Sequence, residues 1–143
     1  MVAAVDPLHR NSEESNLDHK LLSTIEFLSK QLSLSALVFH AYLPLLSSFI
    51  PEIEGTQEFL LGIKKRHEKI LMDFLAGHTI EPTNIKISKG ELVPGLTDYI
   101  EASATSILVI GALSRNILER AIIGDTAEQI LEGCPCDVLV LKS

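Results

Sequence analysis

Four short runs in which every residue is apolar constrain the fold of this chain most strongly. They are residues 2–5, 36–39, 107–110 and 138–141. Because these runs lack the alternation of a half-exposed strand, they predict strands buried on both faces, as in a parallel sheet. A fifth segment, residues 84–88, alternates polar and apolar residues and is typical of a strand at a sheet edge.

Helical periods separate the predicted strands. Apolar residues recur at spacings of three and four in four segments, residues 17–32, 59–74, 92–100 and 126–132. Ser15 and Asp18 form a cap signal before the first of these helices, and Gly77 is placed to end the second. Strands that alternate with helices predict right-handed crossovers and a parallel sheet covered by helices on both faces.

Length and composition agree with a globular α/β chain. The 143 residues, 46% of them hydrophobic and 22% charged, suit one domain spanning residues 1–143. The net charge of −7 repels phosphate backbones and anionic lipid, so nucleic acid and membrane surfaces are not expected as partners.

Several sequence features favour the cytoplasm as the location of this chain. No apolar run approaches the roughly 18 residues that span a bilayer. Met1 to Asp6 has neither the basic region nor the long apolar region of a signal peptide. The two cysteines lie close together in sequence and provide no disulfide framework.

Two loops are expected to leave the carboxyl ends of strands, where ligands of open α/β sheets bind. Residues 6–16 form a polar loop after the first strand, and residues 42–55 form an apolar, proline-marked loop after the second. We interpret the second loop as packing over a helix. The alternative is a cover for an apolar small ligand, which would make the protein a carrier.

The segment from Ile107 to Ser143 resembles the signature end of the universal stress protein family. That family has Gly-x-x-Gly after a strand, then nine residues and Gly-Ser or Gly-Thr. Here the frame is Gly111, two residues, Ser114, nine residues, Gly124 and Asp125. The resemblance extends over nearly the whole chain and is closest to the second half of tandem universal stress proteins. Two alternatives stay open: the chain is a compact single domain, or it is one domain of a longer chain.

The resemblance implies a five-stranded parallel sheet of order 3-2-1-4-5, the adenine nucleotide alpha hydrolase-like fold. It also implies a stress-response protein that is usually dimeric, and ATP with Mg²⁺ as the ligand of members that keep the motif. Carried over position by position, the nucleotide would contact eight residues: Asp6, Ala41, Gly111, Ser114, Arg115, Gly124, Asp125 and Thr126.

Three departures from the family pattern predict weak or absent ATP binding. Ser114 carries a Cβ where the family has its second glycine, and Asp6-Pro7 replaces Asp-Gly-Ser. Asp125 replaces a hydroxyl residue; at a helix N-cap its carboxylate would accept the N–H groups that a phosphate needs. A carboxylate about 4 Å from a phosphate charge costs between ~1 and ~4 kcal/mol, depending on the local dielectric. Arg115 or a bound metal ion could offset that cost.

The chain shows no catalytic motif, so we expect a binding module and not an enzyme. The alternative is a slow ATP hydrolase, which would need Asp6 near a metal ion. The histidines lack metal-ligand spacing, and His40 and His67 are interpreted as packing residues. Cys134 and Cys136 are interpreted as structural, because two thiols cannot fill a tetrahedral zinc site.

In the implied strand order, the strand from Val138 to Leu141 lies at a sheet edge although it is apolar throughout. An exposed apolar edge is an aggregation hazard unless it is covered. We therefore predict that this strand pairs with the same strand of a second copy, giving a homodimer, or with the other half of a tandem chain.

Overall fold

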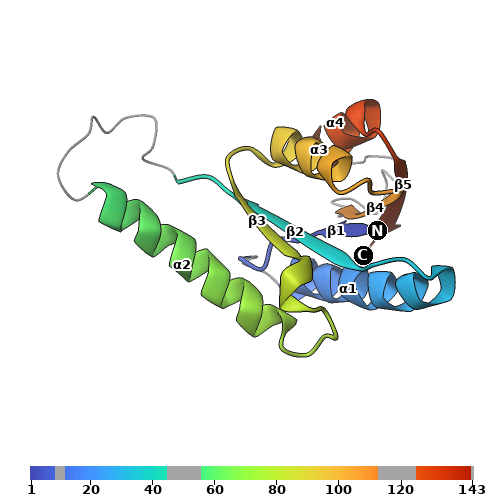
Figure 1. Cartoon of the computed structure of the whole chain (residues 1–143), viewed down its shortest axis with the longest axis horizontal. Coiled ribbons are helices and arrows are strands. Elements are labelled where there is room, and N and C mark those ends of the chain that lie inside the picture. The colour runs from blue at the N-terminus through green and yellow to red at the C-terminus, as the bar shows by residue number, and fades with distance from the viewer. Residues whose placement is uncertain (9–11, 45–55, 113–124, 143) are drawn as a thin grey trace.

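The structure is a computed structural model that describes residues 1–8, 12–44, 56–112 and 125–142. Its strands form one parallel sheet in the order β3-β2-β1-β4-β5 (Figure 1). The strands are β1 (Val2–Ala4), β2 (Leu37–Tyr42), β3 (Ile85–Lys89), β4 (Ile107–Ala112) and β5 (Asp137–Lys142). The predicted fold class and strand order are thus confirmed, and the alternating segment does form an edge strand.

Helices cover both faces of this sheet. They are α1 (Ser12–Leu32), α2 (Thr56–Leu75), α3 (Leu92–Ala102) and α4 (Asp125–Gly133), with a short 3-10 helix η1 (Pro82–Asn84) before β3. In Figure 1, α1 and α2 lie below the sheet and α3 and α4 lie above it. Because every crossover joins parallel strands, the carboxyl ends of all five strands meet at one edge.

Each face of the sheet has its own hydrophobic core. On the α1 and α2 face the buried side chains include Ala3, Val38, Val109, Leu21, Ile25 and Leu71. On the α3 and α4 face they include Val2, Phe39, Leu108, Leu96, Ile100 and Ile130. Neighbouring residues of one strand belong to different cores, which explains why the central strands are apolar at every position.

The first helix begins earlier than the sequence predicts. α1 starts at Ser12, so the polar loop after β1 is shorter than residues 6–16. Asp18 does not cap the helix: its Oδ2 accepts the backbone N–H of Asp6 at 3.0 Å, and the residue is only 5% exposed. The cap prediction at Ser15 and Asp18 was therefore wrong, because Asp18 ties α1 to the end of β1.

The second strand is longer than its apolar run. β2 continues through His40 and Ala41 to Tyr42, so Tyr42 belongs to the sheet and not to the following loop. Both polar residues are accommodated: His40 is 1% exposed and bonded at both ring nitrogens, and Tyr42 packs on the His67 ring. Of the loop at residues 42–55, residues 45–55 lie outside the described part of the chain.

None of the helices that the structure describes is both long enough and apolar enough to cross a bilayer.

Candidate functional site

The carboxyl edge of the sheet brings together three of the predicted site residues. Ala4 is in register with Phe39 of β2, and Ala3 is in register with Val109 of β4. If these registers are continued along the strands, Asp6 is level with Ala41, and Val5 is level with Gly111. Strand order reverses at β1, between β2 and β4, which is the point where open α/β sheets form a ligand crevice.

Asp6 is exposed at this edge, and its backbone position is fixed. Its N–H donates to Asp18 of α1, and its own Oδ1 accepts the N–H of Leu8 at 3.2 Å. The carboxylate therefore stabilises the turn that follows β1, as a short acidic side chain commonly does. Because the carboxylate is exposed, a metal ion or a ligand hydroxyl can reach it.

Gly111 lies against α1 with no room for a side chain. A Cβ added at Gly111 would lie 2.7 Å from Cδ2 and 3.0 Å from Cγ of Leu17. A side chain at position 111 would force Leu17 to shift, so the packing of α1 on β4 favours glycine here whether or not a phosphate is ever present. Ala41, by contrast, packs with the core on the α3 face of the sheet.

The predicted phosphate-binding residues divide between the described and the undescribed parts of the chain. Ser114, Arg115 and Gly124 lie outside the described residues. Asp125 and Thr126 are exposed and begin α4. α4 begins at Asp125 directly after the undescribed residues 113–124, so the N-cap role of Asp125 stays a prediction; in the first helical turn its charge interacts favourably with the helix dipole.

A pocket of about 320 Å³ lies between the first turns of α3 and α4. Its lining residues are Glu91, Leu92, Val93, Pro94, Thr126 and Gln129. Glu91 precedes α3 and makes no capping hydrogen bond with its side chain. Glu91 lines this pocket, and Asp125 directly precedes the lining residue Thr126, so the negative charge on this side of the sheet disfavours an anionic ligand.

His40 and His67 form a hydrogen-bonded pair that joins β2 to α2. His40 Nδ1 lies 3.1 Å from the carbonyl oxygen of Val5, which can only accept, so Nδ1 carries the proton. The Nε2 atom of neutral His40 must then accept from Nδ1 of His67, 2.8 Å away. The geometry therefore assigns the Nδ1–H tautomer to both rings.

The environment of His67 favours its neutral form. Burial, followed by the nearby His40, lowers the pKa of His67, while the charge of Asp6 acts in the opposite direction. The Tyr42 ring stacks on His67 with centroids 4.8 Å apart. The packing role predicted for both histidines is confirmed, but the direct bond between them was missed because 27 residues separate them in sequence.

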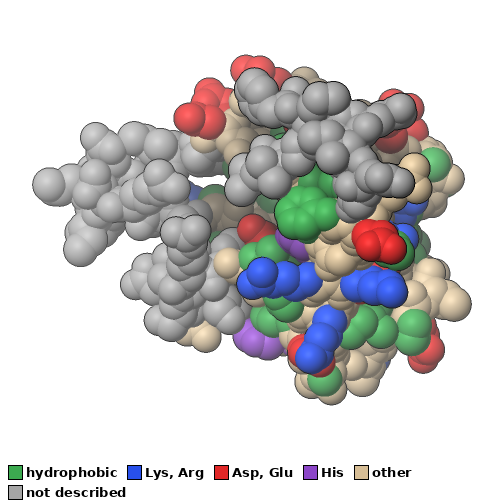
Figure 2. Space-filling view, turned by 90° about the vertical axis from the view of Figure 1, so that its left-hand side faces the viewer, with side chains coloured by type: hydrophobic (Ala, Val, Ile, Leu, Met, Phe, Trp, Pro, Cys, Tyr) green, Lys and Arg blue, Asp and Glu red, His purple; other side chains and the backbone are tan. Residues whose placement is uncertain are grey.

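The side of the molecule on which α2 begins also exposes basic side chains. In Figure 2, Lys and Arg side chains gather beside hydrophobic ones, although the whole chain carries a net charge of −7. The exposed basic residues of α2, whose first turns reach this side in Figure 1, are Lys64, Lys65, Arg66 and Lys69.

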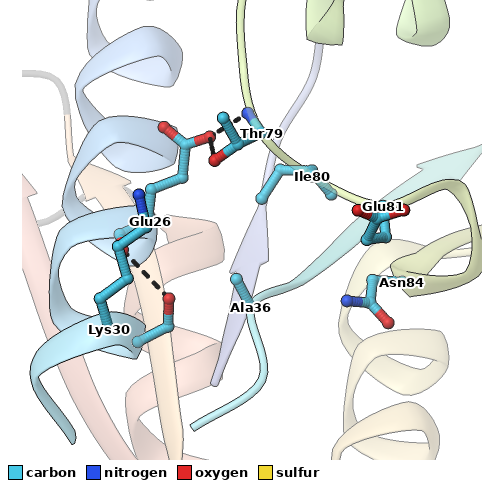
Figure 3. Close-up of a pocket in the computed structure, with 8 residues that line it drawn as sticks. Glu26, Lys30, Ala36, Thr79, Ile80, Glu81 and Asn84 are labelled. Atoms are coloured by element: carbon cyan, nitrogen blue, oxygen red, sulfur yellow. Dashed lines mark hydrogen bonds between the residues drawn. The ribbon is translucent and has the colours of Figure 1, made fainter. Parts of the chain in front are cut away.

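A second cluster connects α1 to the segment between α2 and β3. His19 Nδ1 lies 3.0 Å from His78 Nε2, and His78 Nδ1 lies 3.3 Å from Glu26 Oε2. Glu26 Oε1 also accepts the backbone N–H and the hydroxyl of Thr79, and its carboxylate points toward Thr79 in Figure 3. Burial opposes the charge of Glu26, but these hydrogen bonds dominate and lower its pKa.

The adjoining pocket, of about 180 Å³, is lined by Glu26, Ser29, Lys30, Ala36, Thr79, Ile80, Glu81 and Asn84 (Figure 3). It lies at the amino ends of β2 and β3, away from the edge where the predicted ligand residues meet. Within the described ranges, no three His, Cys, Asp or Glu side chains are grouped to hold a metal ion.

The parallel strand order, with helices on both faces of the sheet, defines a doubly wound α/β protein. A sequence model of the universal stress protein family matches residues 10–142. The chain belongs to the universal stress protein family.

A curated relative carries the same family name, and two solved structures share the fold. Universal stress protein E of Salmonella typhi is 32% identical over 88 residues, which are 59% of this chain and 24% of that protein. A Pseudomonas aeruginosa protein of unknown function is 24% identical with a TM-score of 0.76, covering 99% of this chain and 46% of the other. The universal stress protein UspA from Lactobacillus plantarum is 20% identical with a TM-score of 0.66, covering 98% and 95%. The chain thus spans less than half of the first two proteins.

Proposed function

We propose that this universal stress protein domain acts in the stress response by pairing with a second domain, and binds ATP weakly or not at all. The carboxylate of Asp125 at the start of α4 carries the proposal about ATP. The contact between Leu17 and Gly111 accounts for the glycine without a phosphate, so this glycine by itself does not support a bound nucleotide.

Charge at the same edge supports the proposal. Asp125 begins α4 and Glu91 lines the pocket between α3 and α4. A carboxylate about 4 Å from a phosphate costs between ~1 and ~4 kcal/mol, and each 1.4 kcal/mol is about tenfold in affinity. We therefore expect an affinity for Mg-ATP that is one to three orders of magnitude weaker than a serine at position 125 would allow.

Calorimetric titration of Mg-ATP into the wild type and into Asp125→Ser tests this proposal. The wild type should show a dissociation constant well above the micromolar range, and Asp125→Ser should bind at least tenfold more tightly. Glu128→Ser, which removes a carboxylate from the same helix one turn later, serves as the matched control and should change the affinity less. Sub-micromolar binding by the wild type would overturn the proposal.

Pairing through β5 is the second part of the proposal. β5 lies at the end of the strand order, and its four central residues, 138–141, are apolar and half-buried. The opposite edge strand, β3, instead exposes Lys86 and Lys89, which protect an edge against strand addition. This difference supports β5 as the pairing edge, with a second copy or with another domain of a longer chain.

We also propose that the domain is not an enzyme, with slow ATP hydrolysis as the alternative. Asp6 is the exposed carboxylate at the end of β1, but its Oδ1 already accepts the Leu8 N–H. A phosphate-release assay should stay at background for the wild type and for Asp6→Asn alike. Release above background that Asp6→Asn abolishes would favour the hydrolase.

A further inference from the structure

The two cysteines of the chain form the joint between α4 and β5. α4 ends at Gly133, Cys134 follows directly, and β5 begins at Asp137, directly after Cys136. The two Sγ atoms are 3.5 Å apart, and both residues are half-buried, so small molecules can reach them. These thiols play no part in the nucleotide edge or in the core contacts of α1.

The chain between the cysteines holds the thiols in this arrangement. Pro135 fixes its own φ near −65°, and the backbone bends at Pro135 and Cys136 before entering β5. Cys136 Sγ also lies 3.5 Å from the carbonyl oxygen of Asp137, to which its S–H can donate. A disulfide bond is about 2.05 Å long, so the two sulfurs need to approach each other by only about 1.5 Å.

We propose that Cys134 and Cys136 are a dithiol–disulfide couple that exchanges with low-molecular-weight disulfides such as oxidised glutathione. The inference depends neither on ATP binding nor on pairing through β5. A tetrahedral metal site is disfavoured, because two thiolates supply only half of its ligands and no third metal-binding side chain is grouped with them among the described residues.

The exchange proceeds in two balanced steps. Cys134 Sγ, as the thiolate, attacks one sulfur of oxidised glutathione, forming a mixed disulfide and releasing one glutathione thiolate. Cys136 Sγ then loses its proton and attacks the Cys134 sulfur, which releases the second glutathione. In total the protein dithiol loses two electrons and two protons, and one oxidised glutathione becomes two reduced glutathione molecules.

The two thiols have different roles because their surroundings differ. Burial, and the Cys134 sulfur beside it, raise the pKa of the Cys136 thiol to about 11. Since only the thiolate is an efficient nucleophile, Cys136 is a poor first attacker at neutral pH. It is nevertheless well placed to close the bond, because a group held 3.5 Å from its target has a very high effective concentration.

Mass spectrometry of the native protein in glutathione redox buffers tests the proposal. The tryptic peptide of residues 121–142 contains both cysteines, and after oxidation it should be about 2 Da lighter and resist alkylation until a reductant is added. Cys136→Ser, which keeps the attacking thiol, should accumulate a stable mixed disulfide with glutathione. Cys134→Ser should react at least tenfold more slowly, and the double serine variant should not react.

Circular dichroism establishes that each variant is folded, so that a missing reaction is not mistaken for a missing fold. A disulfide between two protein molecules, a wild type that stops at the mixed disulfide, or cysteines that stay fully alkylatable in oxidising buffer would each overturn the proposal. Equal reaction rates for the two single variants would contradict the assigned order of attack.

Discussion

Leu17 of α1 lies against Gly111 of β4, where a Cβ would come within 2.7 Å of the leucine Cδ2. The two residues are 94 positions apart in the sequence. Leu17 is the first apolar residue in the helical pattern of residues 17–32, and Gly111 is the first glycine of the predicted nucleotide-binding motif. The contact means that packing alone can favour a glycine at this position. A glycine at the end of a strand is then weak support for a bound nucleotide.

Gly111→Ala should destabilise the protein by about 1–3 kcal/mol, the usual cost of overpacking a core. Urea unfolding measures the loss. In a Leu17→Ala background the added methyl group has room, so the cost of Gly111→Ala should largely disappear. These variants form a double-mutant cycle. If the changes that the two substitutions cause in the free energy of unfolding were additive, the contact between Leu17 and Gly111 would be contradicted.

Gly62→Ala is the matched control for that cycle. Gly62 lies inside α2 with nothing within 4 Å of an added Cβ. Since glycine is unfavourable inside a helix, this substitution should stabilise the protein by about 0.5–1 kcal/mol. A destabilisation similar to that of Gly111→Ala would mean that added methyl groups are costly for reasons unrelated to Leu17.

The stability of the fold should fall as the pH falls below about 6.5, the ordinary pKa of histidine. The pKa of His67 is lowered in the folded state, so between the folded and unfolded values the unfolded chain binds more protons. Stability therefore rises with pH through that window and is fully present above it. Urea unfolding between pH 7.5 and 5 measures the slope.

His67→Gln should flatten this pH dependence, because glutamine keeps a donor for His40 Nε2 but does not titrate. An unchanged slope in His67→Gln would assign the pH dependence to other groups. His78→Gln, from the other histidine pair, tests whether the effect is particular to the contact between β2 and α2.

Glu26→Gln should cost about 1 kcal/mol near neutral pH, because it weakens the hydrogen bonds from Thr79 and His78 to a charged acceptor. The pKa of Glu26 is lowered in the folded protein, so its contribution is present above the ordinary glutamate value and is lost as the pH falls through the folded value. Thermal unfolding measures the effect. The melting temperature of the variant should be lower than that of the wild type at pH 7, and this difference should be smaller at pH 3.5. Lys30→Gln, on the wall of the same pocket, is the control and should show no such pH dependence.

Leu139→Lys in β5 should disrupt self-association, because it places a charge on the proposed pairing strand. Sedimentation velocity measures the assembly. Ile87→Lys in the opposite edge strand is a matched control: both residues are half-buried and pack on the same core, but β3 is not the proposed pairing edge. Equal effects of the two substitutions on assembly would contradict pairing through β5.

The sequence predicts the architecture well because burial on two faces leaves a local pattern. Each strand was predicted to within a few residues, and the alternating run at residues 84–88 identified β3 as an edge. The strand order came from the resemblance to the universal stress protein family and not from periodicity. The start of α1 was missed because Asp18 looks like a helix cap in sequence, whereas in the fold it bonds to Asp6.

The candidate site was less predictable because its contacts join distant parts of the chain. Nothing local to His40 or His67 reveals that their rings bond to each other. The same holds for Leu17 and Gly111. The sequence did place Asp6, Ala41 and Gly111 at one edge, since strand ends alone determine that. Nucleotide contacts by the eight predicted site residues remain a prediction.

The crystal structure of the protein soaked with Mg-ATP tests the central claim most directly. We expect the density beside Gly111 to show the Leu17 side chain packed on the glycine, with no triphosphate between the ends of β1 and β4. An ordered triphosphate at that position, with Leu17 displaced and the Asp125 carboxylate turned away, would contradict the claim.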